Sequence, residues 1–423
     1  MGEIQIPFRV ISSAGADLAD PENDLVNYFL SIDTWPIATV LAKVFGPRGR
    51  KGYGVSLFLS RILKVKQLFV SDRILTQRLK EVATYRRLCG FSDGKVPAHN
   101  TYSTLRQALG VKGYAEIHAG FVRCAHALDL LDPELPMLPK NRRPGLIVIA
   151  DSTTIQAYCS TSGKKQPDGT WLFTDRSVAF GRSHHRDKFP IGHKAHSLMT
   201  VTGVPLVSEI SPRNAPDQDY IFPLLDQFTK RFPEIKIAYI VLDKGYDAEP
   251  IHWKLYEHYG IIPIIIRKKI AYPKSFAPDG IPLCTWGQRM SRVVVDYGRK
   301  RTKYACKKVC QRAEQMTFPC RYLGESFPNG QIRYTRFQDG YRKYGPAILG
   351  STIYQKLKPL RTAIERNYGL VKENRYRMET TNTYMGQENV LMHVIEHDIS
   401  LTLDLIFMFK RYGKVSPLLN LNY

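Results

Sequence analysis

Cysteine is scarce in this sequence, and no apolar run is long enough to cross a membrane. Only 7 of the 423 residues are cysteine, an odd and thinly spread number that argues against a disulfide framework and indicates a reducing compartment. The longest apolar runs, 261–266 and 401–409, are much shorter than the roughly 20 residues that a spanning helix needs. The first ten residues, MGEIQIPFRV, lack the basic and apolar regions of a secretory signal. We therefore expect neither membrane insertion nor secretion.

Acidic side chains are too few to balance the basic ones. The sequence has 61 Lys and Arg against 38 Asp and Glu, which gives a formal net charge of +23. A field of this sign attracts polyanions, and nucleic acids are the most common large polyanions in a cell. A membrane surface would instead call for a basic amphipathic segment, and we find no convincing one. The composition therefore predicts a nucleic-acid partner.

The first third of the chain has a helical pattern, from residue 23 to about 131. Its clearest stretch predicts one helix over Ser71–Cys89, with Ser71 as the cap and Gly90 as the end. A polar loop and a short helix over 101–109 follow. This succession is typical of a helix-turn-helix DNA reader, and equally of a plain helical bundle with a basic, solvated face.

Two largely apolar runs predict buried strands, and a carboxylate follows each. Residues 146–150 precede Asp151, and residues 235–242 precede Asp243. The other expected elements are a hairpin at 193–201 and 204–210, helices at 217–232, 249–259 and 387–412, and a strand at 261–266. Together they predict an α/β fold in which helices, the last one included, pack on a mixed sheet.

Asp151 and Asp243 each allow two interpretations. An aspartate after a strand commonly caps a turn by accepting hydrogen bonds from backbone N–H groups. The alternative is a metal ligand or a catalytic acid. If the two strands are neighbours in one sheet, both carboxylates stand at the same edge, where their charges repel unless a divalent cation lies between them. Such oxygen ligands suit Mg²⁺ or Mn²⁺.

A third carboxylate lies on a helix predicted over 356–375. Arg361, Glu365, Tyr368 and Lys372 share one face of this helix. This face is either a surface stripe of salt bridges or a carboxylate held between two cations. The two strand-end aspartates and the positive charge of the chain favour the second interpretation.

Basic side chains are concentrated between residues 267 and 316. Strand-like alternation at 292–297 and 332–337 predicts an inserted, β-rich, basic subdomain over 268–350. Trp286 in this segment is either a base-stacking residue or an ordinary buried tryptophan.

The same segment is rich in cysteine. Cys306 and Cys310 have zinc-like spacing, whereas Cys284 and Cys320 form no second close pair. A structural zinc held by these four residues is therefore possible but is not the favoured interpretation, because the sequence only loosely suggests a closed four-ligand site.

These features together resemble the DDE transposases of bacterial insertion sequences, whose catalytic domain is RNase H-like. IADSTT holds Asp151, LDKGYD holds Asp243, and Arg361, Glu365 and Lys372 form the family's R-x3-E-x6-K signature. That signature marks the group with a β-rich insertion between the second and third acids.

Two further positions bear on the resemblance. GHKAHS at 192–197 is similar to the family's second-strand motif. The family has a tyrosine three residues before the arginine of the signature, and this chain has Lys358 there. Tyr354 and Tyr368 are the nearest aromatic substitutes.

The resemblance implies a transposase that cleaves the ends of its element and joins them to target DNA by a cut-and-paste route. Asp151, Asp243 and Glu365 would be the catalytic residues and the ligands of two Mg²⁺ or Mn²⁺ ions. The implied DNA contacts are Arg361, Lys372, Lys194, Lys244, Arg366 and Trp286. The implied partners are double-stranded DNA with terminal inverted repeats, target DNA and a second copy of the chain in the synaptic complex. The expected location is the bacterial cytoplasm, at the nucleoid.

Two other functions compete with this one. A transposase-derived DNA-binding protein without catalysis would have lost an acid, and all three are present. A zinc metallohydrolase would complete its metal site with imidazoles of His184, His185, His193 and His196 in place of Glu365. Their spacing matches no zinc motif known to us.

We expect the chain to be organised in five parts. They are a helical DNA-end-binding domain at 1–132, a linker at 133–144, an RNase H-like catalytic domain at 145–267 and 351–412, the basic insertion at 268–350, and a tail at 413–423.

Overall fold

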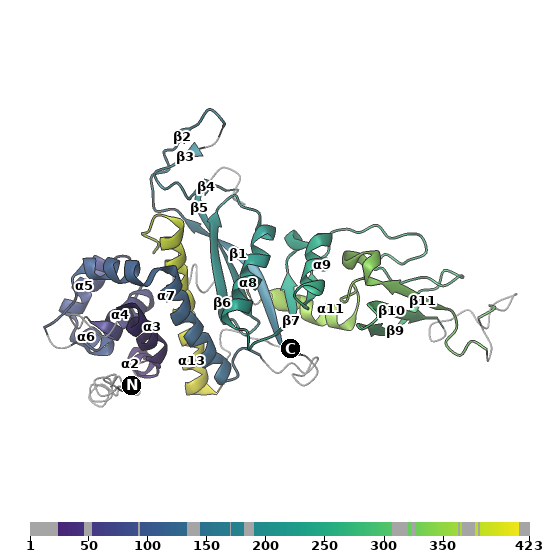
Figure 1. Ribbon diagram of the computed structural model, residues 1–423, viewed down its shortest axis with the longest axis horizontal. Coiled ribbons are helices and arrows are strands. Elements are labelled where there is room, and N and C mark those ends of the chain that lie inside the picture. The colour runs from purple at the N-terminus through teal and green to yellow at the C-terminus, as the bar shows by residue number, and fades with distance from the viewer. Residues whose placement is uncertain are drawn as a thin grey trace. The chain divides into compact units, whose positions relative to one another are not determined.

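The computed structural model divides the chain into two compact units, which are described separately (Figure 1). The first comprises Met1–Pro133, Ala150–Glu234 and Ala363–Tyr423, and the second Glu134–Ile149 and Ile235–Thr362. The structure describes residues 24–45, 53–91, 94–132, 144–169, 171–181, 190–306, 320–322, 326–362, 364–365, 377–379 and 381–413.

Helices form one part of the first unit. They are α2 (Asp24–Leu30), α3 (Trp35–Phe45), α4 (Gly54–Lys66), α5 (Asp72–Glu81), α6 (Ala83–Cys89), α7 (His99–Ala127) and α13 (Gln387–Tyr412). Their apolar faces share one core, to which α13 contributes Met392, Ile395, Ile399 and Leu403. Helix α13 also packs against α7 and strand β6, so the predicted packing of the last helix on the sheet is confirmed.

The prediction of one helix over Ser71–Cys89 is wrong, because the chain breaks at Val82. This residue is extended, with φ −108° and ψ 106°, and it separates α5 from α6. The Arg86 side chain donates hydrogen bonds to the carbonyls of Leu79 and Lys80, which stabilises the break. Both predicted ends are confirmed: Ser71 Oγ accepts from the N–H of Ile74, and Gly90 adopts the left-handed conformation with φ 76°.

The strands of the first unit are the later part of β1 (Leu146–Gln156), β4 (Ala179–Phe180), β5 (Ile191–Thr200) and β6 (Pro205–Pro212). β5 and β6 pair antiparallel, as predicted. The β5 backbone lies close to β1, where the Ala157 N–H donates to the Ile191 carbonyl over 3.2 Å. A Cβ at Gly192 would stand 2.1 Å from the Ile155 oxygen, so only glycine allows this approach.

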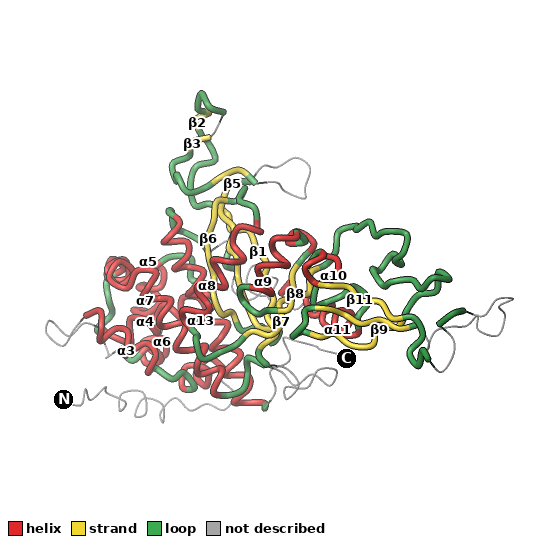
Figure 2. The backbone as a smooth tube through the Cα atoms, turned by 45° about the vertical axis from the view of Figure 1, so that its right-hand side comes forward, coloured by secondary structure: helices red, strands yellow, loops and turns green. Residues whose placement is uncertain are grey.

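Further elements of the first unit adjoin these strands. The 3-10 turn η2 (Asp217–Tyr220) leads into α8 (Ile221–Arg231), and α8 packs on β5 and β6, which confirms the predicted helix. A small hairpin, β2 (Lys164–Lys165) with β3 (Trp171–Leu172), extends beyond the end of β5 (Figure 2).

Parallel strands form the centre of the second unit. They are the first residues of β1, β7 (Ile237–Leu242) and β8 (Ile262–Ile265), and α9 (Glu249–Glu257) packs on β8. Because β1 runs through both units, hydrogen bonds connect the strands in the order β4-β5-β1-β7-β8, with β6 on β5. The expected mixed α/β sheet with flanking helices is thus confirmed.

The second unit also contains a three-stranded antiparallel sheet within the predicted insertion. It is formed by β9 (Ser291–Asp296), β10 (Arg301–Ala305) and β11 (Ile332–Arg336). Both predicted strands are present, and the central strand β10 was not foreseen. The remaining elements are η3 (Lys244–Tyr246), η5 (Phe337–Asp339), α10 (Tyr341–Tyr344), α11 (Thr352–Leu357) and η6 (Lys358–Arg361).

No single helix in the described ranges is long and apolar enough to cross a membrane. Helices α2 and α3 together have the length and composition of a membrane-spanning segment, but the chain bends between them. Both helices contribute side chains to the helical core.

Candidate active site

Asp151 lies in β1, at the end of its apolar run. The four residues before it, Ile147–Ala150, are at most 1% exposed, and the Asp151 side chain is the first to be only half-buried. The N–H of Ser152 donates to Asp151 Oδ1 over 2.8 Å. The strand therefore places a partly accessible carboxylate where its buried section ends.

Asp243 occupies the matching place on β7. Ile149 pairs with Val241 in the parallel register of β1 and β7, and each aspartate follows its paired residue by two positions. Asp243 is the N-terminal flanking residue of η3, and its side chain is 44% exposed. Arg361 Nη1 lies 3.9 Å from Asp243 Oδ1, so the structure brings a cation of the signature motif beside the second acid.

Glu365 is helical and exposed, and its neighbour Ile364 is buried. It belongs to the first unit, together with Asp151, whereas Asp243 belongs to the second. Lys372, Arg366 and Tyr368 lie outside the described residues.

Tyr354 does not fit the suggestion that it replaces the family's tyrosine. It is 1% exposed, and its hydroxyl donates to the Ile265 carbonyl over 2.9 Å. This side chain is therefore part of the core of the second unit.

Lys194 and Ser152 both bond to an aspartate that the sequence did not single out. Ser152 Oγ donates to Asp217 Oδ1 over 2.8 Å, and Lys194 Nζ donates to the same oxygen over 3.0 Å. Lys194 Nζ also donates to the Ala215 carbonyl. The only sequence signal for Asp217 was its place at the start of a predicted helix.

A fully buried carboxylate, Asp247, follows Asp243 by four residues. Its Oδ2 accepts hydrogen bonds from the Lys268 N–H and from the Arg342 guanidinium, and its Oδ1 lies 3.0 Å from His252 Nε2. Burial alone would raise the pKa of Asp247, but the hydrogen bonds of His252 and Arg342 hold it well below its usual value. Burial lowers the pKa of His252 to about 4. Asp247 thus joins the turn after β7 to Lys268 and Arg342, near the two ends of the predicted insertion.

The imidazoles proposed for a zinc site have other partners where they are described. His193 Nε2 bonds to Ser177, and His196 Nε2 bonds to Ser211. His184 and His185 lie outside the described residues. Nowhere in the described ranges do three His, Cys, Asp or Glu side chains form a group that could hold a metal ion.

The cysteines of the insertion are described only in part. Cys284 is half-buried, Cys306 and Cys320 are buried, and Cys310 is outside the described residues. Cys306 Sγ accepts a hydrogen bond from the Gln331 N–H over 3.1 Å.

Trp286 is exposed, so the interpretation of an ordinary buried tryptophan is wrong. Its exposed fraction is 44%, and it lies in a turn that the hydrogen bond from the Gly287 N–H to the Cys284 carbonyl closes. Lys244, in η3 beside Asp243, is exposed as well.

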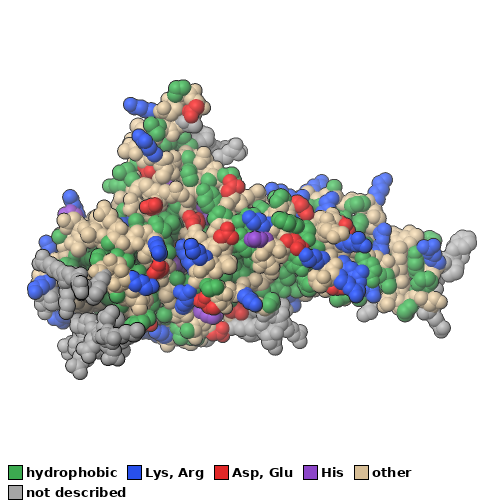
Figure 3. Space-filling view, in the orientation of Figure 1, with side chains coloured by type: hydrophobic (Ala, Val, Ile, Leu, Met, Phe, Trp, Pro, Cys, Tyr) green, Lys and Arg blue, Asp and Glu red, His purple; other side chains and the backbone are tan. Residues whose placement is uncertain are grey.

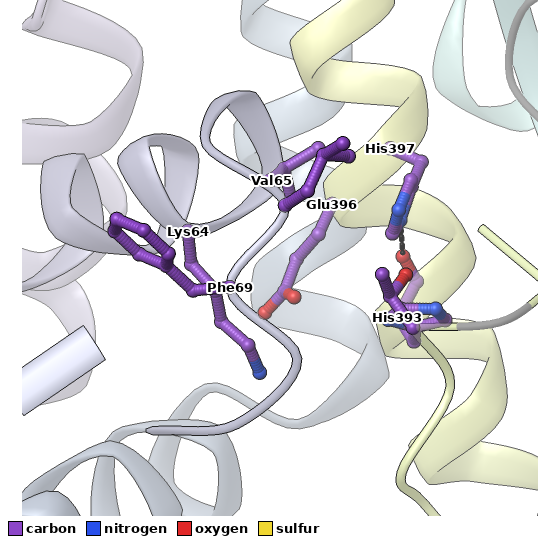
Figure 4. A pocket seen from close by; sticks show the side chains of 8 residues that line it. Lys64, Val65, Phe69, His393, Glu396 and His397 are labelled. Carbon is purple, nitrogen blue, oxygen red and sulfur yellow. Dashed lines mark hydrogen bonds between the residues drawn. The ribbon is translucent and has the colours of Figure 1, made fainter. Parts of the chain in front are cut away.

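One small pocket lies away from these residues, in the helical part of the first unit. His393, Glu396 and His397 line it from α13, together with Lys64 (Figure 4). Its volume of about 10 Å³ has room for about one water. Because Arg61 and Arg106 bond to the Glu396 carboxylate, this cluster is a structural one.

Two family models match the sequence. One described as "Transposase DDE domain" matches residues 142–394, and one described as "Transposase domain (DUF772)" matches residues 15–108. No curated protein matches the chain.

Proposed function

Because the chain belongs to the DDE transposase family, we propose that Asp151, Asp243 and Glu365 are its catalytic carboxylates. The protein is a DNA transposase, an enzyme that binds and cleaves DNA with divalent metal ions. The observation that carries this assignment is that Asp151 and Asp243 each follow, by two positions, one member of the pair Ile149–Val241 in two parallel strands. The competing interpretations, a protein without catalysis and a zinc metallohydrolase, have no comparable support.

The donor set fits Mg²⁺ or Mn²⁺. All three side chains offer hard carboxylate oxygens, and all three are at least partly exposed. We propose that Asp151, Asp243 and Glu365 would together hold two such ions. Bound ions would supply Lewis-acid stabilisation of the charge that develops at the scissile phosphate. The carboxylates would orient the attacking water, and later the freed 3′-hydroxyl, for in-line displacement.

Basic side chains around these acids would hold the DNA backbone. Arg361, beside Asp243, and Lys244, exposed in the following turn, are described in the structure. The other proposed contacts are Lys194, Arg366 and Lys372. Phosphate contacts of this kind fix the register of the duplex without reading its sequence.

The positive charge of the protein supports the binding of DNA over a wide surface. On the face shown in Figure 3, Lys and Arg side chains are spread widely rather than gathered at one point. We propose that the helical N-terminal region binds the terminal inverted repeats. Two copies of the chain would hold two ends for cut-and-paste transfer into target DNA, at the bacterial nucleoid.

Cleavage of a labelled duplex carrying the element's own terminal repeats in Mg²⁺ tests this proposal. Asp151→Asn, Asp243→Asn and Glu365→Gln are each expected to lower the cleavage rate by more than about 100-fold, since even residues that support metal ligands are worth about 10- to 100-fold. Binding of the same duplex should persist.

The matched control is Glu388→Gln, which changes an exposed glutamate in the first turn of α13. Full activity of Glu365→Gln would refute the proposed site. A wild-type protein that binds the repeats and never cuts them would support the non-catalytic alternative. Activity that needs Zn²⁺ and survives all three substitutions would support the metallohydrolase.

Trp286 provides a separate prediction. We propose that it stacks on a base extruded near the cleavage site. Trp286→Ala is expected to lower the yield of end processing about 10-fold, because base–aromatic stacking is worth about 1–3 kcal/mol. The increase in fluorescence of a 2-aminopurine placed beside the scissile bond should also disappear. Trp253→Ala is the control, because Trp253 is 50% exposed in the same unit; equal effects of both substitutions would contradict the role of Trp286.

A further inference from the structure

Three segments of the first unit meet at Asp217. Ser152 comes from β1, Lys194 from β5, and Asp217 itself from η2, directly before α8. Oxygen Oδ1 of Asp217 accepts both the Ser152 hydroxyl, at 2.8 Å, and the Lys194 ammonium, at 3.0 Å. Ser152 in turn uses its backbone N–H to bond Asp151.

The negative charge of Asp217 is balanced by a positive charge beside it. Lys194, which is 20% exposed, forms an ion pair with Asp217. Among the described residues, the only other basic side chain within ion-pair distance of Asp217 is a histidine. That histidine is His196, with Nδ1 3.8 Å from Asp217 Oδ1. Burial lowers the pKa of His196 to about 4, so its ring is neutral near pH 7 and stacks on Tyr220 at 4.1 Å. Asp217 therefore has one charged partner and one hydroxyl partner.

We propose that Asp217 is a positioning residue for the carboxylate of Asp151 and that it acts through Ser152. This inference rests on the proposed role of Asp151 in catalysis. In this role Asp217 acts by hydrogen bonding, with Oδ1 accepting from both Lys194 and Ser152.

The geometry of a strand explains why such a support is needed. Neighbouring side chains on a strand point to opposite faces, so Ser152 is directed away from the face of Asp151. The pairing of β1 with β7 ends at Ile149, two residues before Asp151. The bond from Ser152 to Asp217 holds β1 just beyond that point. It fixes the amide that donates to Asp151 Oδ1, which orients the carboxylate before any ligand binds.

Asp217→Asn, Asp217→Glu and Ser152→Ala test the inference in the full-length protein. Asp217→Asn is expected to raise the Mg²⁺ concentration for half-maximal cleavage by about 10- to 100-fold, with a smaller loss of rate at saturating Mg²⁺. Asp217→Glu, which keeps the charge, should recover part of this loss. In metal-free protein without DNA, the amides of residues 152 and 153 should exchange hydrogen faster in Asp217→Asn than in the wild type.

Asp219→Asn is the matched control, since Asp219 is exposed in the same short turn. If Asp217→Asn fails to fold, Ser152→Ala removes the same hydrogen bond and leaves the Lys194 pair in place. Wild-type metal dependence and wild-type amide exchange in both variants would overturn the inference. Cleavage by Asp151→Asn at the wild-type rate would instead refute the proposed function, so the two failures are distinguishable.

Discussion

Asp247→Ala is expected to lower the free energy of unfolding of the second unit by about 3–5 kcal/mol, the usual effect of removing one partner of a buried ion pair. The Asp247 side chain is fully buried, and Arg267, with Nη1 3.6 Å from Oδ1, is only 5% exposed. Without the carboxylate, this guanidinium and that of Arg342 lose their counter-charge inside the protein. The loss of the Lys268 N–H acceptor adds to the effect.

Urea denaturation measures this change, and hydrogen exchange of the β7 and β8 amides locates it in the second unit. Asp247→Asn keeps the shape of the side chain and should be destabilised as well, since the charge is what the arginines require. The control is Asp296→Ala, whose partners Arg299 and Arg301 lie at 3.9 and 3.8 Å in a partly exposed group. A change below about 1 kcal/mol is normal there, and an equally small change at Asp247 would contradict our account.

Glu396→Ala should destabilise the helical part of the first unit by a similar amount, about 3–5 kcal/mol. Glu396 is 4% exposed, and it accepts two hydrogen bonds from Arg61, at 3.0 and 2.7 Å, and one from Arg106, at 3.1 Å. Arg61 lies in α4, Arg106 in α7 and Glu396 in α13. The substitution therefore leaves two buried guanidinium groups without their shared counter-charge.

This effect depends on pH with a definite sign. Burial would raise the pKa of Glu396, but Arg61 and Arg106 lower it from 4.5 to about 2. The stabilisation by the carboxylate is therefore complete above about pH 4.5 and is lost as the pH falls toward 2. Denaturation curves of wild type and Glu396→Ala should converge in acid. Glu388→Ala, on the exposed face of the same helix, should change stability by less than about 0.5 kcal/mol at every pH.

Elements with a strong periodic signal were predictable from the sequence. The last helix has the predicted bounds, Gln387–Tyr412, and the β5–β6 hairpin and the parallel strands stand where apolar runs predicted them. The break at Val82 was not predictable from its neighbours, because the Arg86 side chain stabilises it. Strand β10 was missed as well. Arg301 and Lys303 interrupt its apolar pattern, and its pairing depends on β9 and β11.

The residues of the candidate site were likewise only partly predictable from the sequence. Asp151 and Asp243 were recognisable as candidates, because a carboxylate directly after an apolar run is a local pattern. The expectation that the first strand ends at Asp151 is wrong, because β1 continues to Gln156. Asp217 and Asp247 were not, because their partners are distant in the chain. Ser152 is 65 residues from Asp217, and Arg342 is 95 residues from Asp247. The exposure of Trp286 depends on a turn that only the folded chain defines.

Lys268 and Arg342, near the two ends of the predicted insertion, meet at a single carboxylate. Lys268, where the inserted segment begins, and Arg342, near its end, both bond to Asp247 Oδ2. A segment that leaves and returns at one point imposes little strain on the strands beside it, and the entropy of closing such a loop grows only slowly with its length. The intervening chain can therefore gain or lose residues while β7 and β8 keep their register. We therefore expect the parallel strands to tolerate changes in the length of the chain between Lys268 and Arg342.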